Sequence, residues 1–467
     1  MRFLCLSFLL LFAFNLEAQI KIEFEVSNYE SDSLIVGYYI MDRQLVQDTV
    51  LRDDNGRFIL DSNEDLAPGV YLLLLQPDNN FIQFLVNEND SDFKLKIDYP
   101  LLSEIQYEST PDKSAFQDYV DLVTAIRPTA AVLRDTIEVM RSKGQDPGEF
   151  EGQLTRMDDT VEKMQKDIVE NYPGSVAALL LKANINIDSP EFEDTDEGGI
   201  QKYLYYRKHY FDNIELDNPV SLRTPFLHQR IDYYLNKLTP NHPDSICNTI
   251  DSLLHWMSPS EESFKYYLSH FLNTYAKSKI VGYDAIYVYL VDNYYSKGKA
   301  PWVEEENLLK LEDNANKVRP VLIGKQGPDI TVYDEMNNPI SISDIEYEYL
   351  VLLFWSPDCG HCKKTMPDFI EFDKKWRDRG IRTFAICSKH QEKVKDCWEY
   401  VKEKDMLGFI NAADEFHKSR FKLKYNVQST PKVFILDKNR EILMKNVGGD
   451  QLDRVMEELL KRENEKE

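Results

Sequence analysis

The fold is decided by one stretch of sequence, Tyr349-Leu350-Val351-Leu352-Leu353-Phe354-Trp355-Ser356-Pro357-Asp358-Cys359-Gly360-His361-Cys362. Its apolar residues 349–355 predict a buried strand, and a helical pattern begins at the two cysteines. Free N–H groups and the positive end of the helix dipole lower the pKa of a thiol at such a helix start. Because the thiolate is the nucleophile in thiol–disulfide exchange, we expect Cys359 to be the reactive thiol and Cys362 its partner.

Composition limits the class of protein. A chain of 467 residues is too long for one hydrophobic core and suggests several domains. Its hydrophobic content of 43% is typical of folded globular protein. With a net charge of -25 it has no basic stripe that could displace counterions from phosphates, so nucleic acid is an unsuitable partner. We interpret the charge as a solvated, self-repelling surface.

The N-terminus predicts export. Arg2 is followed by an apolar run over residues 3–14 and then by the small residue Ala18, which is typical of a secretory signal peptide over residues 1–18. A bilayer span needs about 20 apolar residues, and neither this run nor any later one reaches that length. We therefore expect a mature chain in the periplasm or cell envelope, without a transmembrane segment.

The cysteines fit an exported protein that is not a disulfide scaffold. Once Cys5 leaves with the signal peptide, an odd number remains, so at least one thiol is free or paired with another molecule. Cys387 ends a predicted strand and Cys397 lies on the helix that follows it. A bridge between them is one interpretation, and two unrelated buried thiols are the other. The second is favoured because most such pairs do not meet disulfide geometry.

Three zones follow the signal peptide. Residues 19–104 alternate apolar and polar side chains between turn signals and predict a β-sandwich. Residues 105–315 have a helical period, with Pro128 and Pro173 expected as breaks and an acidic loop over 191–194 ending at Gly198-Gly199. We expect the tyrosines of this helical domain, at 203–206 and 283–289, to be packing residues more than a binding platform. Its scattered histidines lack metal-ligand spacing, and we predict no metal site.

The third zone, residues 320–467, predicts alternating strands and helices. A hairpin is expected over 330–342, followed by strand 349–355, helix 360–378, strand 382–387 and a helix over about 391–404. A short strand near 409–410, a helix around 414–423, a hairpin of strands 432–437 and 441–444, and a helix over 451–463 complete the order. This order is that of a thioredoxin fold.

Several motifs make the family resemblance specific. The segment from Phe354 to Lys364, Pro367 in the following helix and Ser429-Thr430-Pro431 before a strand resemble the TlpA/ResA-like branch of the thioredoxin superfamily. The whole layout, with the segment 297–302, resembles multidomain envelope members common in Bacteroidetes. The resemblance implies an exported thiol–disulfide oxidoreductase in which Cys359 attacks and Cys362 resolves. It also implies that Thr430 and Pro431 form a cis-proline loop against the thiols, offering backbone groups to an extended substrate.

Two departures from the family pattern concern proton transfer. Thioredoxin has a buried acid six residues before its first cysteine, where this chain has Leu353. Many ResA-like reductases have Glu three residues after the second cysteine, where this chain has Thr365. The proton of Cys362 could pass to water, to Asp358 or to a group not visible in the sequence. His361 could stabilise the Cys359 thiolate, which would move the couple from about -270 mV, as in thioredoxin, toward about -180 mV, as in protein disulfide isomerase.

Other functions of the two thiols are less well supported. A structural zinc site needs a second ligand pair, and Cys387 and Cys397 are too widely spaced to resemble one. A peroxiredoxin-type peroxidase would need a Thr or Ser and a Pro placed before its cysteine in a different register. Ser356 fits that pattern, whereas Leu352 does not.

We therefore predict an enzyme that needs no cofactor and exchanges disulfides with envelope proteins, supplied by a membrane electron donor or acceptor. The alternative is an envelope scaffold that binds proteins through residues 20–315, with the thioredoxin domain secondary.

Overall fold

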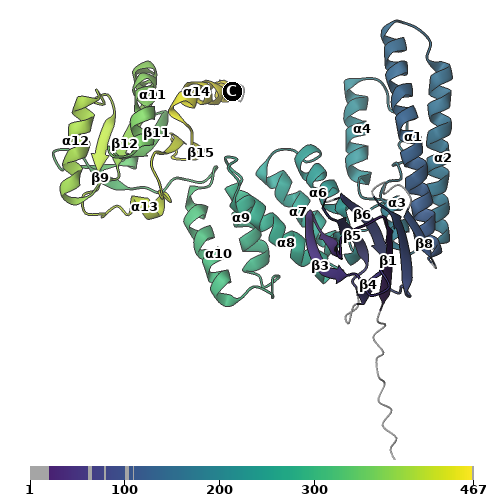
Figure 1. The fold of residues 1–467 in the computed structure, drawn as a ribbon. Helices are drawn as coiled ribbons and strands as arrows, with labels where there is room; N and C mark the ends of the chain where they lie inside the picture. Colours follow the sequence, from purple (N-terminus) through teal and green to yellow (C-terminus); the bar gives the residue numbers. More distant parts are fainter. Residues whose placement is uncertain (1–19, 62–65, 78–79, 100–104, 109, 465–467) are drawn as a thin grey trace, which may run out of the picture. The chain divides into compact units, whose positions relative to one another are not determined.

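The computed structural model describes residues 20–61, 66–77, 80–99, 105–108 and 110–464. The predicted signal peptide over residues 1–18 lies outside them. The described chain forms two compact units (Figure 1). The first runs to Pro240 and includes Ser252–Phe264, and the second contains Asn241–Asp251 and everything from Lys265 onward.

The first unit begins with two four-stranded sheets that share one core. Side chains alternate along β1 (Lys21–Ser27), where Ile22, Phe24 and Val26 are buried. The buried faces of both sheets contribute to one cluster, in which the rings of Phe24 and Phe84 meet edge to face. The predicted β-sandwich is therefore confirmed. Its sheets have the orders β4 (Phe58–Asp61), β1, β7 (Phe93–Asp98), β8 (Ile105–Glu108), and β3 (Arg43–Leu51), β2 (Ser33–Ile40), β5 (Gly69–Leu75), β6 (Asn80–Val86).

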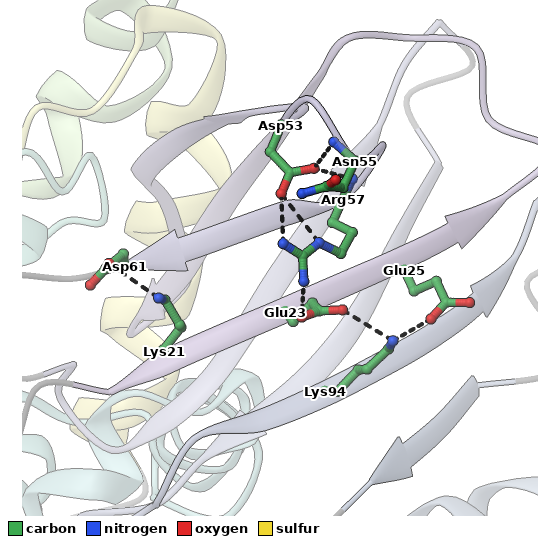
Figure 2. Close-up of polar contacts among 8 residues, drawn as sticks. All are labelled: Lys21, Glu23, Glu25, Asp53, Asn55, Arg57, Asp61 and Lys94. Carbon is green, nitrogen blue, oxygen red and sulfur yellow. Dashed lines mark hydrogen bonds and ion pairs between the residues drawn. The ribbon is translucent and has the colours of Figure 1, made fainter.

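Charged side chains cover the outer face of the first sheet (Figure 2). Glu23 accepts from Arg57 at 3.4 Å and from Lys94 at 3.0 Å, and Lys94 also pairs with Glu25. Asp53 forms an ion pair with Arg57, with Oδ2 3.0 Å from Nη2. These side chains are 23–52% exposed, so this face is a solvated surface, on which such pairs contribute about 0–1 kcal/mol each.

The helical region confirms the predicted class and corrects two of its details. Pro128 does not break the helix but lies inside the 32-residue α1, which continues despite the lost intrahelical N–H donor. Gly198 and Gly199 do not end the acidic loop but lie in the first turn of α4. A Cβ at Gly198 would lie 2.0 Å from the carbonyl oxygen of Glu193, so the loop requires glycine there.

The helices of this region, in chain order, are α1 (Pro111–Ser142), α2 (Gly148–Asn171), α3 (Val176–Lys182), α4 (Asp196–His209), α5 (Pro219–Leu222), α6 (Pro225–Lys237), α7 (Pro243–Met257), α8 (Glu261–Ala276), α9 (Asp284–Leu290) and α10 (Glu305–Val318). Helices α1 and α2 pack side by side (Figure 1). No helix in the described part of the chain is long and apolar enough to cross a membrane.

The tyrosines of the helical region divide between core and surface. Tyr287 is buried, as the packing interpretation predicts. Tyr203 and Tyr206 are each 39% exposed, which corrects that interpretation for α4. Among the described residues of α4, only Gly198 is buried, so this helix presents most of its surface to solvent.

The second unit ends in a seven-stranded mixed sheet with helices on its faces. Central strand β11 (Tyr349–Trp355) is buried at every residue, as its continuous apolar run predicts. It pairs in parallel with β12 and antiparallel with β14, and apolar clusters cover both faces of the sheet. The strand order is β10 (Pro339–Ser341), β9 (Thr331–Tyr333), β13 (Ile410–Ala413), β12 (Ile381–Cys387), β11, β14 (Lys432–Asp437), β15 (Ile442–Lys445).

The helices of this sheet are α11 (Gly360–Trp376), α12 (Val394–Glu403), α13 (Phe421–Lys424) and α14 (Leu452–Asn464). The predicted α/β thioredoxin fold is confirmed, with one local correction. The helix expected around 414–423 is only the four residues of α13. The carboxylate of Asp414 accepts from the backbone N–H groups of Lys418 and Ser419 and from the Ser419 hydroxyl, which holds the preceding segment in a loop.

Candidate functional site

Cys359 lies between the end of β11 and the start of α11. It is the N-cap of α11, and its sulfur accepts a hydrogen bond from the backbone N–H of Cys362 at 3.2 Å. Burial by itself would raise the pKa of Cys359, but hydrogen bonds from Cys362, Thr430 and the backbone of His361 lower it below the ordinary value. Cys359 is also partly accessible to solvent. A partner disulfide can therefore reach a thiol that ionises more easily than usual.

Cys362 has the opposite environment. It is 1% exposed and packs in the core cluster between α11 and the sheet. Burial, and then the hydrogen bond and charge of Cys359, raise its pKa to about 12. The two thiols of the predicted pair therefore differ in both accessibility and acidity, in the direction that the sequence predicts. Their catalytic roles stay predictions.

The Thr430–Pro431 loop lies against the first thiol. The thiol of Cys359 donates to the carbonyl oxygen of Thr430 at 3.1 Å, although the two residues are 71 positions apart. The Thr430–Pro431 peptide is cis, as the family resemblance implies. Within the described chain, no backbone carbonyl accepts a hydrogen bond from the N–H groups of Gln428, Ser429 or Thr430. They are free to pair with an extended segment of another chain.

The four residues at the positions considered for proton transfer have different surroundings. Leu353 is fully buried at the position of the thioredoxin acid, and Thr365 donates its hydroxyl to the carbonyl of His361 at 3.0 Å. The carboxylate of Asp358 is held in an ion pair by Lys389. The side chain of His361 is exposed, and it is the backbone of His361 that hydrogen-bonds the Cys359 sulfur.

Comparison with known proteins identifies the family of this domain. The AhpC/TSA family matches residues 323–444. The thiol-disulfide oxidoreductase ResA of one Bacillus cereus strain is 30% identical over 127 residues, which are 27% of this chain and 70% of that protein. The chain belongs to the ResA-related thioredoxin-like proteins of the AhpC/TSA family. Its C-terminal part is thus a thioredoxin-like thiol–disulfide oxidoreductase domain, and the family suggests oxidoreductase activity at low identity.

Three further similarities were found for this chain. The ResA protein of a second Bacillus cereus strain, ATCC 10987, is 28% identical over 148 residues, which are 32% of this chain and 82% of that protein. The crystal structure of a thioredoxin-like protein from Bacteroides caccae is 17% identical, covers 58% of this chain and 98% of its own, and has a TM-score of 0.42. A domain of unknown function, DUF5106, matches residues 190–320, in the helical region.

A disulfide in the ResA-related domain settles the pairing that the sequence leaves open. Cys387 and Cys397 are bonded, with their Cα atoms 6.3 Å apart, so the less favoured of the two interpretations is the one observed. The geometry is possible because α12 returns across the end of β12. Since these two cysteines bind each other, they do not supply the second ligand pair that a zinc site would need.

The disulfide lies directly behind the reactive segment. Cys387 is the register partner of Trp355, and the N–H of Ser388 donates to the Trp355 carbonyl at 2.8 Å. Tyr400 packs on the Trp355 ring, with the ring centroids 5.2 Å apart. Lys389 then reaches Asp358, beside Cys359. The sequence analysis did not identify Lys389 or Tyr400 as residues near the site. The only signals were that Lys389 closely follows strand 382–387 and that Tyr400 closely follows Cys397.

Proposed function

We propose that this chain is an exported thiol–disulfide oxidoreductase that exchanges disulfides with proteins of the cell envelope through Cys359 and Cys362. The observation that carries the proposal is the unequal pair of thiols. An accessible thiol of lowered pKa stands beside a buried thiol of raised pKa, and the Thr430–Pro431 loop lies against the first. The ResA relatives support the reaction class, and the predicted signal peptide supports the compartment.

In the reducing direction the reaction has two exchanges. The Cys359 thiolate attacks one sulfur of a substrate disulfide, forms a mixed disulfide and releases the other substrate sulfur as a thiolate. Cys362 then loses its proton and attacks the Cys359 sulfur, which releases the second substrate thiolate. The substrate gains two electrons, and the protein keeps a Cys359–Cys362 disulfide. An external dithiol, which we assign to a membrane electron donor, must reduce that disulfide for the next cycle.

The raised pKa of Cys362 makes the second exchange the step that needs a base. Asp358 is engaged by Lys389, so we propose that the departing substrate thiolate or water takes the Cys362 proton. With an electron acceptor in place of the donor, the same steps run in reverse and oxidise substrate dithiols. The partner therefore sets the direction.

A trapping experiment tests the proposal. In Cys362→Ser the mixed disulfide cannot be resolved, so substrates are expected to remain attached through Cys359. Cys359→Ser is the matched control and should attach none. The measurement is non-reducing electrophoresis and mass spectrometry of complexes from the cell envelope. Equal trapping by both variants, or by neither, would contradict the proposal. N-terminal sequencing of the mature chain tests the cleavage after Ala18.

The scaffold alternative rests on one observation. The AhpC/TSA match covers only residues 323–444, so most of the chain lies outside the oxidoreductase domain. A variant in which both Cys359 and Cys362 are serine separates the two functions. Loss of partner capture supports the oxidoreductase, and undiminished capture of the same proteins supports the scaffold.

A further inference from the structure

A pocket lies beside the Thr430–Pro431 loop, between that loop and the last three helices of the helical region. All of its walls belong to the second unit. Its volume is about 230 Å³, and its lining includes Tyr275, Asp284, Asn314, Lys317, Asn426 and Gln428. The first four residues come from the end of α8, from α9 and from α10, and the last two come from the segment that leads into Thr430. The pocket is therefore shared between the ResA-related domain and helices that precede the AhpC/TSA match.

This pocket is close to the reactive thiol. Gln428 is two residues before Thr430, and two extended residues span at most about 7 Å. The Thr430 carbonyl oxygen is 3.1 Å from the Cys359 sulfur. A substrate segment bound to Cys359 and paired with the free N–H groups of residues 428–430 would run toward the pocket. Because such a segment advances about 3.3 Å per residue, a side chain a few positions from the substrate cysteine can enter it.

Buried contacts hold the helices in place beside the loop. Lys445, on β15, is 2% exposed, and its Nζ donates to Asp284 Oδ2 at 2.5 Å and to the Val321 carbonyl at 2.7 Å. Strand β15 pairs with β14, whose first residue, Lys432, directly follows Pro431. Burial, and then the neighbouring charge of Lys445, lower the pKa of Lys432. The start of α9 is thus tied to β15, the neighbour of the strand that continues the loop, and the pocket is formed before a substrate arrives.

We propose that this pocket binds a polar side chain of an extended protein substrate and so makes α8, α9 and α10 part of the recognition surface of the oxidoreductase. This inference rests on the proposed function. Seven of the ten residues that line the pocket carry a carboxylate, ammonium, amide or phenol group. An apolar side chain would cover these groups without replacing their water hydrogen bonds, whereas glutamine can both donate and accept.

The test fills the pocket without touching the thiols. Asn314 is exposed on α10, so Asn314→Trp should fold while occupying the pocket. Asn307→Trp is the matched control, because Asn307 is also exposed on α10, two turns earlier, and does not line the pocket. Exchange is measured with synthetic peptide disulfides that carry glutamine or leucine at successive positions, and with a small aromatic disulfide that cannot reach the pocket. Thermal unfolding checks that each variant folds.

We expect the wild-type protein to prefer the glutamine peptide at one position. Asn314→Trp should remove that preference and lower kcat/KM for that peptide about tenfold or more, while leaving the small disulfide within about twofold. Asn307→Trp should match wild type with both. Wild-type peptide kinetics in Asn314→Trp, an equal loss with both disulfides, or no preference for glutamine would each overturn the inference. Absence of any exchange by the wild-type protein would instead contradict the proposed function.

Discussion

Selective alkylation of the reduced protein examines the unequal thiols directly. The pKa of Cys359 is lowered from its ordinary value of 9.0 and that of Cys362 is raised to about 12, so the gap is on the order of three pH units. Below both values, Cys359 therefore has roughly a thousand times more thiolate than Cys362. A more basic thiolate is intrinsically more reactive, with a Brønsted coefficient of about 0.4–0.5, which reduces the advantage to about 30- to 60-fold. Because Cys362 is buried, the reagent reaches it less easily, and the rate advantage of Cys359 increases again.

The assay is a time course with iodoacetamide between pH 6 and 10, quenched and mapped by mass spectrometry. The rate at Cys359 should rise with pH through a midpoint below 9.0 and level off above that midpoint, because only the thiolate reacts and its pKa is lowered. Cys247 is an internal control, since it is 6% exposed and burial raises its pKa to about 12. It should react as slowly as Cys362, and all three thiols should react in denaturant.

A second variant separates burial from the influence of the neighbouring thiol. In Cys359→Ala the hydrogen bond and charge of Cys359 are gone, but the burial that is the main cause of the raised Cys362 pKa remains. Cys362 should therefore stay slow. Faster labelling of Cys362 than of Cys359 in the native wild-type protein would refute the assignment of roles.

Three further perturbations test residues around the site. His361→Ala should make the potential of the Cys359–Cys362 couple more negative by tens of mV in a glutathione titration, and an unchanged potential would show that the exposed ring does not tune the thiols. Replacing Cys387 and Cys397 together by alanine removes a cross-link of sequence separation 10, which should lower the free energy of unfolding in denaturant by about 3 kcal/mol. Complete alkylation of both cysteines in unreduced, denatured protein would contradict the bridge itself. Lys445→Met should cost about 1–3 kcal/mol, because Asp284 and the Val321 carbonyl lose their donor. Adding Asp284→Asn should recover part of that loss, and a simple sum of the two effects would mean that the pair is not coupled.

The sequence by itself determined the elements whose patterns are local. The apolar run 349–355 predicted a fully buried strand and the pattern after it predicted a helix start at the two cysteines, where Cys359 is the N-cap. The alternation in residues 22–26 likewise fixed which side chains of β1 face the core. These features depend on neighbours within a few residues, so periodicity and capping were sufficient to predict them.

Only the tertiary structure decided the contacts between distant segments. It closed the Cys387–Cys397 bridge, brought Thr430 to the Cys359 sulfur, placed Lys389 on Asp358 and set α8, α9 and α10 beside the loop. It also replaced the helix expected after Asp414 by a loop, because the carboxylate satisfies backbone donors that a helix would otherwise bind. Local propensity does not indicate which residues, distant in sequence, become hydrogen-bond partners or line a pocket. Those choices follow from the packing of the whole sheet and its helices.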